Sequence, residues 1–103
     1  MTGKTSLEVN GNVIKLDRFV RAFVVHTVSG MLESLDDTEP IANLILSIND
    51  KEIYIMLNGK SVSTNEFVNI ILKSTLFGMV FPLKGVNIKN MSELRTLKIE
   101  FTR

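Results

Sequence analysis

One pattern occurs twice in this chain, and the two copies are 48 positions apart. The first copy covers residues 7–35 and the second covers residues 55–83. Eight positions are identical in both; in the first copy they are Asn10, Gly11, Phe19, Val20, Thr27, Gly30, Met31 and Leu35. Strand and helix periodicity alone does not explain why both helices contain Thr-x-x-Gly-Met. The repetition predicts a single domain, residues 1–103, made of two pseudo-symmetric repeats at about 5–49 and 51–103.

Each copy begins with the signals of a β-hairpin. Apolar and polar residues alternate over 6–9, as in a strand that is buried on one face. Asn10-Gly11 follows, and both residues tolerate the positive φ that a type I′ turn requires. A two-residue turn pairs Leu7 with Ile14, which keeps the apolar side chains of 12–16 on the same face.

A helix is predicted after each hairpin, at about 17–35 and 65–81. Asp17 and Asn65 stand before the apolar runs in the position of an N-cap, and Pro82 ends the second helix. Helical spacing places these residues of the first helix on the core face: Phe19, Val20, Phe23, Val24, Thr27, Met31 and Leu35. Other apolar residues lie outside the core faces and predict an interface; they are Ala22, Val25, Leu32, Ile70, Phe77 and Val80.

The remaining segments predict the fold class. Strands are expected over 41–48, 51–57 and 93–102, with a tight turn at Asn49-Asp50. Their inward residues are Leu44, Leu46, Ile48, Ile53, Ile55, Leu57, Leu97, Ile99 and Phe101. These elements predict a two-layer α+β domain, in which two helices cover one face of a mainly antiparallel sheet. With the short segments after the Asn-Gly turns as peripheral hairpin strands, the order is the ferredoxin-like βαββαβ; ubiquitin-like halves are the alternative.

Gly30 and Gly78 lie inside the predicted helices, where glycine costs about 1 kcal/mol relative to alanine. A close approach of two backbones explains such a cost, so the two helices are predicted to touch at these glycines. The alternative is that each glycine faces its own strand. If the helices touch there, Gly30→Leu and Gly78→Leu both destabilise the fold strongly.

The composition excludes several classes of protein. Of 103 residues, 45% are hydrophobic and 22% are charged, which is typical of a chain with a packed core. The net charge of +1 provides no overall field that attracts nucleic acid or an anionic membrane. Without cysteine the chain has no disulfide and no thiolate metal site. A polar N-terminus and the lack of a bilayer-length apolar run predict a cytoplasmic protein with no membrane partner.

The chemically reactive residues form no recognisable site. Gly3-Lys4-Thr5 resembles the end of a phosphate-binding loop but lacks the preceding glycine and strand. His26 is the only histidine, and no carboxylate lies at helical spacing from it, which predicts a surface or interface position. The sequence predicts no catalytic, cofactor-binding or metal-binding residue, and no cofactor.

The two copies differ most in the loops after their helices, at 36–40 and 84–92. The first loop belongs to an acidic cluster, for which a solvated helix end is predicted and cation binding is the alternative; its members are Glu33, Asp36, Asp37 and Glu39. The second loop contains Lys84 and Lys89, with Arg95 beyond it. One hypothesis is that the basic loop of one subunit meets the acidic loop of another. The alternative is that both loops are independently solvated.

The run from Leu7 to Val20, Leu-x-Val-Asn-Gly-x-x-Ile-x-Leu-Asp-x-Phe-Val, resembles the start of small uncharacterised archaeal proteins. Those proteins have a similar Asn-Gly turn and a helix that begins with Asn/Asp-x-Phe-Val. The second copy follows the pattern less closely, since Ser63-Thr64 replace Lys15-Leu16. The resemblance implies a cytoplasmic, archaeal-type protein without an assigned activity, and it carries over no functional residue.

The function predicted from these features is a non-enzymatic protein-interaction module that self-associates, most simply as a twofold homodimer. Another protein is a further candidate partner. The first alternative is nucleic-acid binding through the open sheet face, where the predicted outward residues are Lys51, Tyr54, Thr96 and Lys98. Tyr54 is the one aromatic among them, so nucleic acid is an unlikely partner. The second alternative is an enzyme with a site between subunits.

Overall fold

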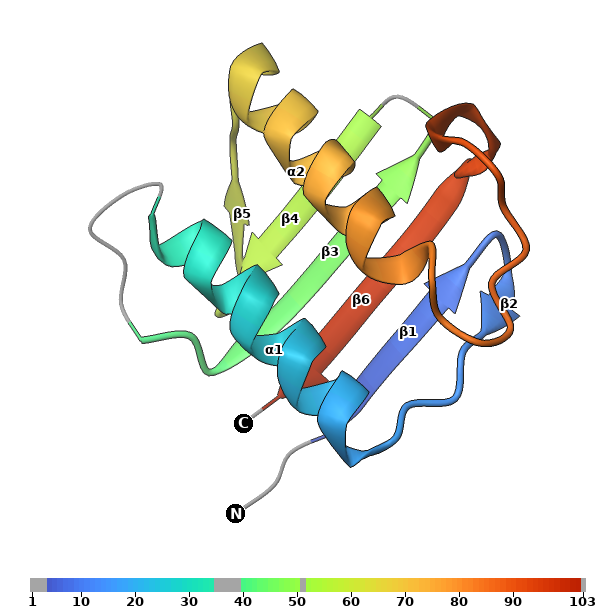
Figure 1. Cartoon of the computed structure of the whole chain (residues 1–103). Helices are drawn as coiled ribbons and strands as arrows, with labels where there is room; N and C mark the ends of the chain where they lie inside the picture. The colour runs from blue at the N-terminus through green and yellow to red at the C-terminus, as the bar shows by residue number, and fades with distance from the viewer. Residues whose placement is uncertain (1–3, 35–39, 51, 103) are drawn as a thin grey trace.

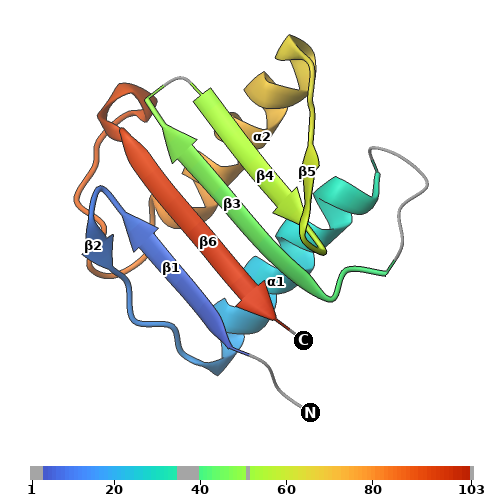
Figure 2. The ribbon, with the colours of Figure 1, turned by 180° about the vertical axis from the view of Figure 1, so that it is seen from behind.

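Six strands form one antiparallel sheet among the residues that the computed structural model describes, which are 4–34, 40–50 and 52–102. In chain order the elements are β1 (Thr5–Val9), β2 (Asn12–Val13), α1 (Arg18–Glu33), β3 (Asn43–Asn49), β4 (Glu52–Leu57), β5 (Lys60–Val62), α2 (Glu66–Val80), the 3₁₀ turn η1 (Met91–Glu93) and β6 (Thr96–Thr102). Both helices cover the same face of the sheet (Figure 1), and the other face is open (Figure 2). The predicted two-layer α+β architecture is therefore confirmed.

The strands lie in the order β2-β1-β6-β3-β4-β5. Read from the opposite edge, the order is the same once each strand is replaced by the corresponding strand of the other copy. β3 and β6 are central, β1 and β4 flank them, and the short strands β2 and β5 are at the edges. Along the chain the long strands and helices follow as strand, helix, strand, strand, helix, strand. In the sheet the second and fourth long strands are central, whereas a ferredoxin-like sheet has the first and third there. The likeness to that fold is therefore limited to the order along the chain.

The pairing of β1 with β6 has the same register as the pairing of β4 with β3. Leu7 of β1 lies opposite Ile99, and Ile55 of β4 lies opposite Leu46. Leu46 and Ile99 also face each other across the two central strands. Both are fully buried, so the middle of the sheet is also the middle of the core.

Asn58 turns the chain between β4 and β5 and also holds the beginning of β3. Its φ of 51° is in the left-handed region, and Gly59 after it has a φ of 80°, as predicted for a type I′ turn. The Asn58 Oδ1 atom accepts hydrogen bonds from the backbone N–H groups of Ala42 (2.8 Å) and Asn43 (3.1 Å). Its Nδ2 atom donates to the Pro40 carbonyl at 3.1 Å.

Asn10 makes the same three side-chain bonds at the beginning of β6. Its Oδ1 atom accepts from the N–H groups of Arg95 (2.8 Å) and Thr96 (3.0 Å). Its Nδ2 atom donates to the Glu93 carbonyl at 2.8 Å. We call these two sets of bonds the asparagine clamps. Each clamp joins a hairpin turn to the segment that enters a central strand from the preceding loop.

Both helices begin at the predicted caps. Asp17 Oδ1 accepts a hydrogen bond from the Val20 N–H, and Asn65 Oδ1 accepts one from the Val68 N–H, each at 2.8 Å. These bonds satisfy backbone donors that the first helical turn leaves unpaired.

The predicted core face of α1 is partly wrong. Phe19 and Phe23 were placed inward, but they are 74% and 46% exposed, respectively. The buried positions of this helix are Val24, Val28, Ser29 and Leu32. In α2 they are Leu72, Leu76, Met79 and Val80. The predicted position of Leu32 and Val80 outside the core faces is therefore wrong, since both are buried. Each helix has enough apolar residues for two adjacent stripes, and the stripe of compact aliphatic side chains is the one that packs on the sheet.

The predicted contact between the helices at Gly30 and Gly78 is also wrong. Both glycines are exposed, and a Cβ atom added to either would meet no atom within 4 Å. Neither glycine faces a strand. Substitution by leucine therefore does not destabilise the monomer through a clash.

Three smaller differences concern the strands. β3 extends to Asn49, which pairs with Glu52, so the tight turn begins at Asp50. Only Asn12–Val13 of the segment 12–16 is strand, although the Ile14 N–H still donates to the Leu7 carbonyl. β6 begins at Thr96 because η1 takes up part of the preceding segment. The predictions for Gly3, Leu35, Lys51 and residues 36–39 lie outside the described residues.

Candidate functional site

Each helix has a row of four residues that points away from the sheet, spaced at i, i+4, i+7 and i+11. We call them the outer rows. The outer row of α1 is Phe19, Phe23, His26 and Gly30; the outer row of α2 is Phe67, Ile71, Ser74 and Gly78. All eight residues are exposed, and none of them is Asp, Glu, Lys or Arg. The solvent face of a helix in a globular protein is normally polar.

The large side chains of the outer rows are well exposed. Phe67 is 69% exposed and Ile71 is 43% exposed, close to the values for Phe19 and Phe23 in α1. The rings of Phe19 and Phe23 stack with their centroids 6.1 Å apart. Ile70, which is 59% exposed, lines a shallow depression of about 250 Å³ together with Met91 beside α2. This apolar surface therefore extends beyond the rows themselves.

The two helices run in opposite directions across the sheet (Figure 1). Each outer row has its large apolar residues in the N-terminal half of the helix and its glycine in the C-terminal half. The glycine half of one helix therefore lies at the same end of the helix layer as the ring-bearing half of the other helix. Within the outer rows, the rings therefore occupy one diagonal of the helix layer and the glycines occupy the other. Outside the rows, Phe81 packs on Phe77 just beyond the glycine end of α2.

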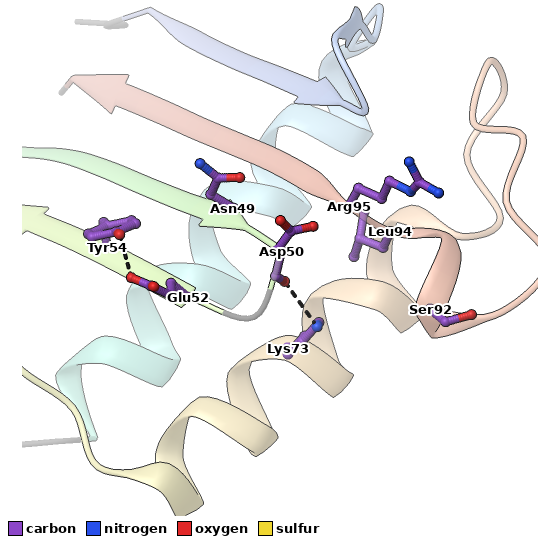
Figure 3. Close-up of a pocket in the computed structure, with 8 residues that line it drawn as sticks. All are labelled: Asn49, Asp50, Glu52, Tyr54, Lys73, Ser92, Leu94 and Arg95. Carbon is purple, nitrogen blue, oxygen red and sulfur yellow. Dashed lines mark hydrogen bonds between the residues drawn. The ribbon is translucent and has the colours of Figure 1, made fainter.

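A polar hollow of about 730 Å³ lies at the β3–β4 turn (Figure 3). It is lined by Asn49, Asp50, Glu52, Tyr54, Lys73, Ser92, Leu94 and Arg95. The Lys73 ammonium donates a hydrogen bond to the Asp50 carbonyl at 3.2 Å. This bond attaches the β3–β4 turn to α2. Two acidic and two basic side chains line this open surface, and among the described lining residues no nucleophile is paired with a base.

The hydroxyl of Tyr54 donates a hydrogen bond to the Glu52 carboxylate at the rim of this hollow. The pKa of Tyr54 is raised above its usual value, mainly by this hydrogen bond and next by the repulsion between the carboxylate and a phenolate. Glu52→Gln is therefore expected to shift the ionisation of Tyr54 to lower pH. Because Tyr54 is the only tyrosine and the chain has no tryptophan, its ultraviolet absorbance reports the shift directly. An unchanged titration curve would show that the bond does not persist in solution.

The open face of the sheet offers little to nucleic acid. Its outward-pointing charges in the described strands are Glu8, Glu52, Lys98 and Glu100. Three of these four charges repel phosphate, and Lys98 is 3.9 Å from Glu100. Tyr54 is exposed as predicted, but no other aromatic ring of the described strands lies on this face, since Phe101 of β6 is buried in the core. Stacking and electrostatic attraction are therefore both weak here.

The structure places the other candidate residues apart from one another. His26 lies in the outer row of α1, in agreement with the predicted surface or interface position. Lys84 and Lys89 are exposed in the loop after α2. Thr5 begins a strand rather than a helix, so the resemblance to a phosphate-binding loop is not supported. Within 4–34, 40–50 and 52–102, no group of three or more His, Cys, Asp or Glu side chains is placed to hold a metal ion.

The outer rows as such were not predicted from the sequence. Helical spacing placed Phe19 and Phe23 in the core and assigned neither Phe67 nor Ile71 to a surface. A signal was nevertheless present, since Phe and Gly recur at the same helical positions in both copies. In the described part of the chain, neither helix has the length and apolarity needed to cross a membrane. Comparison with protein-family models, curated proteins and solved structures gave no significant match.

Proposed function

We propose that this chain is a non-enzymatic interaction module that associates with a second copy of itself through the outer rows of α1 and α2. The observation that carries the proposal is the make-up of those rows, which have four large apolar side chains at positions normally occupied by polar residues. An apolar face of this kind is a feature of protein interfaces. The open sheet face also exposes three neighbouring apolar side chains, Ile45, Tyr54 and Met56. Polar partners lie beside them, because Glu100 is opposite Ile45 and Ser47 is opposite Tyr54.

The apolar area is suited to a dimer of ordinary size. The contributing residues are Phe19, Phe23, Phe67, Ile70, Ile71 and Phe81, which together expose roughly 600 Å². A specific interface of standard size buries about 800 Å² on each partner, and its rim is polar. The apolar residues can thus form the core of such an interface, with polar neighbours as its rim.

The test is the molar mass in solution, measured by light scattering over a range of protein concentrations. We expect a dimer, and we expect the double variant Phe19→Glu/Phe67→Glu to be monomeric. Loss of a central aromatic residue typically costs 2 kcal/mol or more of binding free energy, which is roughly 30-fold in affinity. Because both rings are exposed in the monomer, the variant keeps its core.

Val13→Glu is the matched control. Val13 is 75% exposed and lies on β2, away from the helices, so the same change of an exposed apolar residue to glutamate leaves the dimer intact. A wild-type chain that is monomeric throughout, or a control that dissociates as readily as the double variant, contradicts the proposal.

Internal duplication accounts for the presence of two outer rows, and we propose it as the origin of the chain. The repeated strand registers and the two asparagine clamps support it, because both involve residues that correspond between the copies. The resemblance of 7–20 to small archaeal proteins, and the cytoplasmic location that it implies, remain predictions on which the proposed dimer does not depend.

A further inference from the structure

One end of the helix layer is basic. Arg18 begins α1 next to the capping carboxylate of Asp17, and Arg21 of the same turn lines a hollow beside β1 and β6 together with Glu100. Lys84 follows the end of α2, in a loop that passes beside the segment leading into α1, where a Cβ on Gly85 would be 3.8 Å from Ile14. These positive charges therefore lie at the same end of the layer.

The other end of the helix layer is acidic. Glu33 is the last residue of α1, and Glu66 is the first residue of α2. Because the helices run in opposite directions, these two residues lie at the same end of the layer (Figure 1). The surface proposed to form the dimer thus has a charge gradient along the helices.

Two helix layers can stack face to face about a twofold axis in the plane between them, running either across the helices or along them. Rotation about either axis places the diagonal of rings of one copy over the diagonal of glycines of the other copy. In either arrangement the rings of one copy therefore lie above the glycines of the other. An exposed glycine leaves a notch in the helix surface, which a ring such as that of Phe23 can enter. The shape alone does not choose between the axes.

The charges do choose between them. An axis along the helices places α1 on α2 of the second copy, so Arg18 approaches Lys84 and Glu33 approaches Glu66. An axis across the helices places each helix antiparallel on its own counterpart, so Arg18 approaches Glu33 and Glu66 approaches Lys84. Complementary potentials are favoured across protein interfaces, and like charges are costly.

We infer that the helix layers of two copies stack about a twofold axis that runs across the helices, with α1 antiparallel on α1 and α2 antiparallel on α2. The inference rests on the proposed dimer and specifies its geometry. His26 is the outer-row residue nearest the middle of α1, and Ser74 is the one nearest the middle of α2. Each therefore meets the same residue of the second copy near the axis. Phe23 of one copy lies above Gly30 of the other, and Ile71 lies above Gly78.

Single cysteine substitutions test this geometry cleanly, because the chain has no cysteine of its own. We expect His26→Cys alone and Ser74→Cys alone each to give covalent dimers with a short thiol-reactive crosslinker. Lys98→Cys, on the open face of the sheet, is the control and stays uncoupled. The charge pairing is tested by Arg18→Glu, which weakens the dimer by roughly tenfold. Adding Glu33→Arg to that variant restores the affinity.

The outcomes separate this inference from the proposed function. Crosslinking only when His26→Cys chains are mixed with Ser74→Cys chains indicates the axis along the helices and overturns the inference, but it leaves the dimer standing. A dimer by light scattering in which neither variant crosslinks places the interface elsewhere and overturns the inference as well. A wild-type chain that is monomeric by light scattering contradicts the proposed function itself.

Discussion

Asn58→Gly is expected to lower the free energy of unfolding by about 2–3 kcal/mol, although glycine suits the turn. The φ of 51° at this residue costs glycine nothing, so the substitution removes only the side chain and its three hydrogen bonds. Each such bond contributes about 1 kcal/mol. The loss corresponds to a fall in Tm of roughly 10 °C or more for a domain of this size.

Asn10→Gly is expected to have a similar effect, because Asn10 makes the corresponding three bonds at β6. Asn58→Asp is a graded variant, since its carboxylate keeps the acceptor for two N–H groups and loses the donor to Pro40. Asp50→Gly is the control, because Asp50 also has a positive φ, of 57°, and its side chain accepts no hydrogen bond from the described residues. Denaturant unfolding measures all four variants.

Equal stability of wild type and Asn58→Gly would show that the clamp contributes nothing. An effect of Asp50→Gly as large as that of Asn58→Gly would attribute the loss to the flexibility of glycine in the unfolded chain instead. Unequal effects at Asn10 and Asn58 would weaken the equivalence of the two halves.

Gly30→Leu combined with Gly78→Leu is expected to abolish the dimer and to leave the monomer at least as stable as wild type. Both positions are exposed with open space around them, and leucine is a better helix former than glycine by about 0.5–1 kcal/mol. In the stacked dimer, however, the leucines fill the notches that receive Phe23 and Ile71. We expect a loss of affinity of at least about 100-fold, given the cost of overpacking an interface at two places on each copy.

Light scattering measures the dimer, and denaturant unfolding of dilute protein measures the monomer. Gly30→Ala with Gly78→Ala is the graded control, since a methyl group gives most of the gain in helix propensity and fills little of each notch. A double leucine variant that unfolds more easily than wild type at low concentration contradicts the finding that the glycines are free of contacts. One that still forms the wild-type dimer contradicts the stacked geometry.

Local signals in the sequence were enough to predict most of the fold. The Asn-Gly turns, the caps at Asp17 and Asn65 and the inward strand residues depend on backbone preferences and period-two patterning within a few positions. The side-chain bonds of Asn10 and Asn58 could not be predicted in the same way. They connect a turn to segments 85 and 15 residues away along the chain, and only the strand order brings those segments together.

The sequence by itself determined the class of fold, the two-residue turns, the helix starts and the presence of more apolar helix surface than one core face can bury. Only the tertiary structure decided which stripe of each helix is buried. Helical spacing fits Phe19 and Phe23 as well as Val24 and Val28, so periodicity cannot choose between neighbouring stripes. The buried stripe is decided by packing, because compact aliphatic side chains from both layers fill the space between helix and sheet closely. The rings and the two glycines are therefore left facing outward.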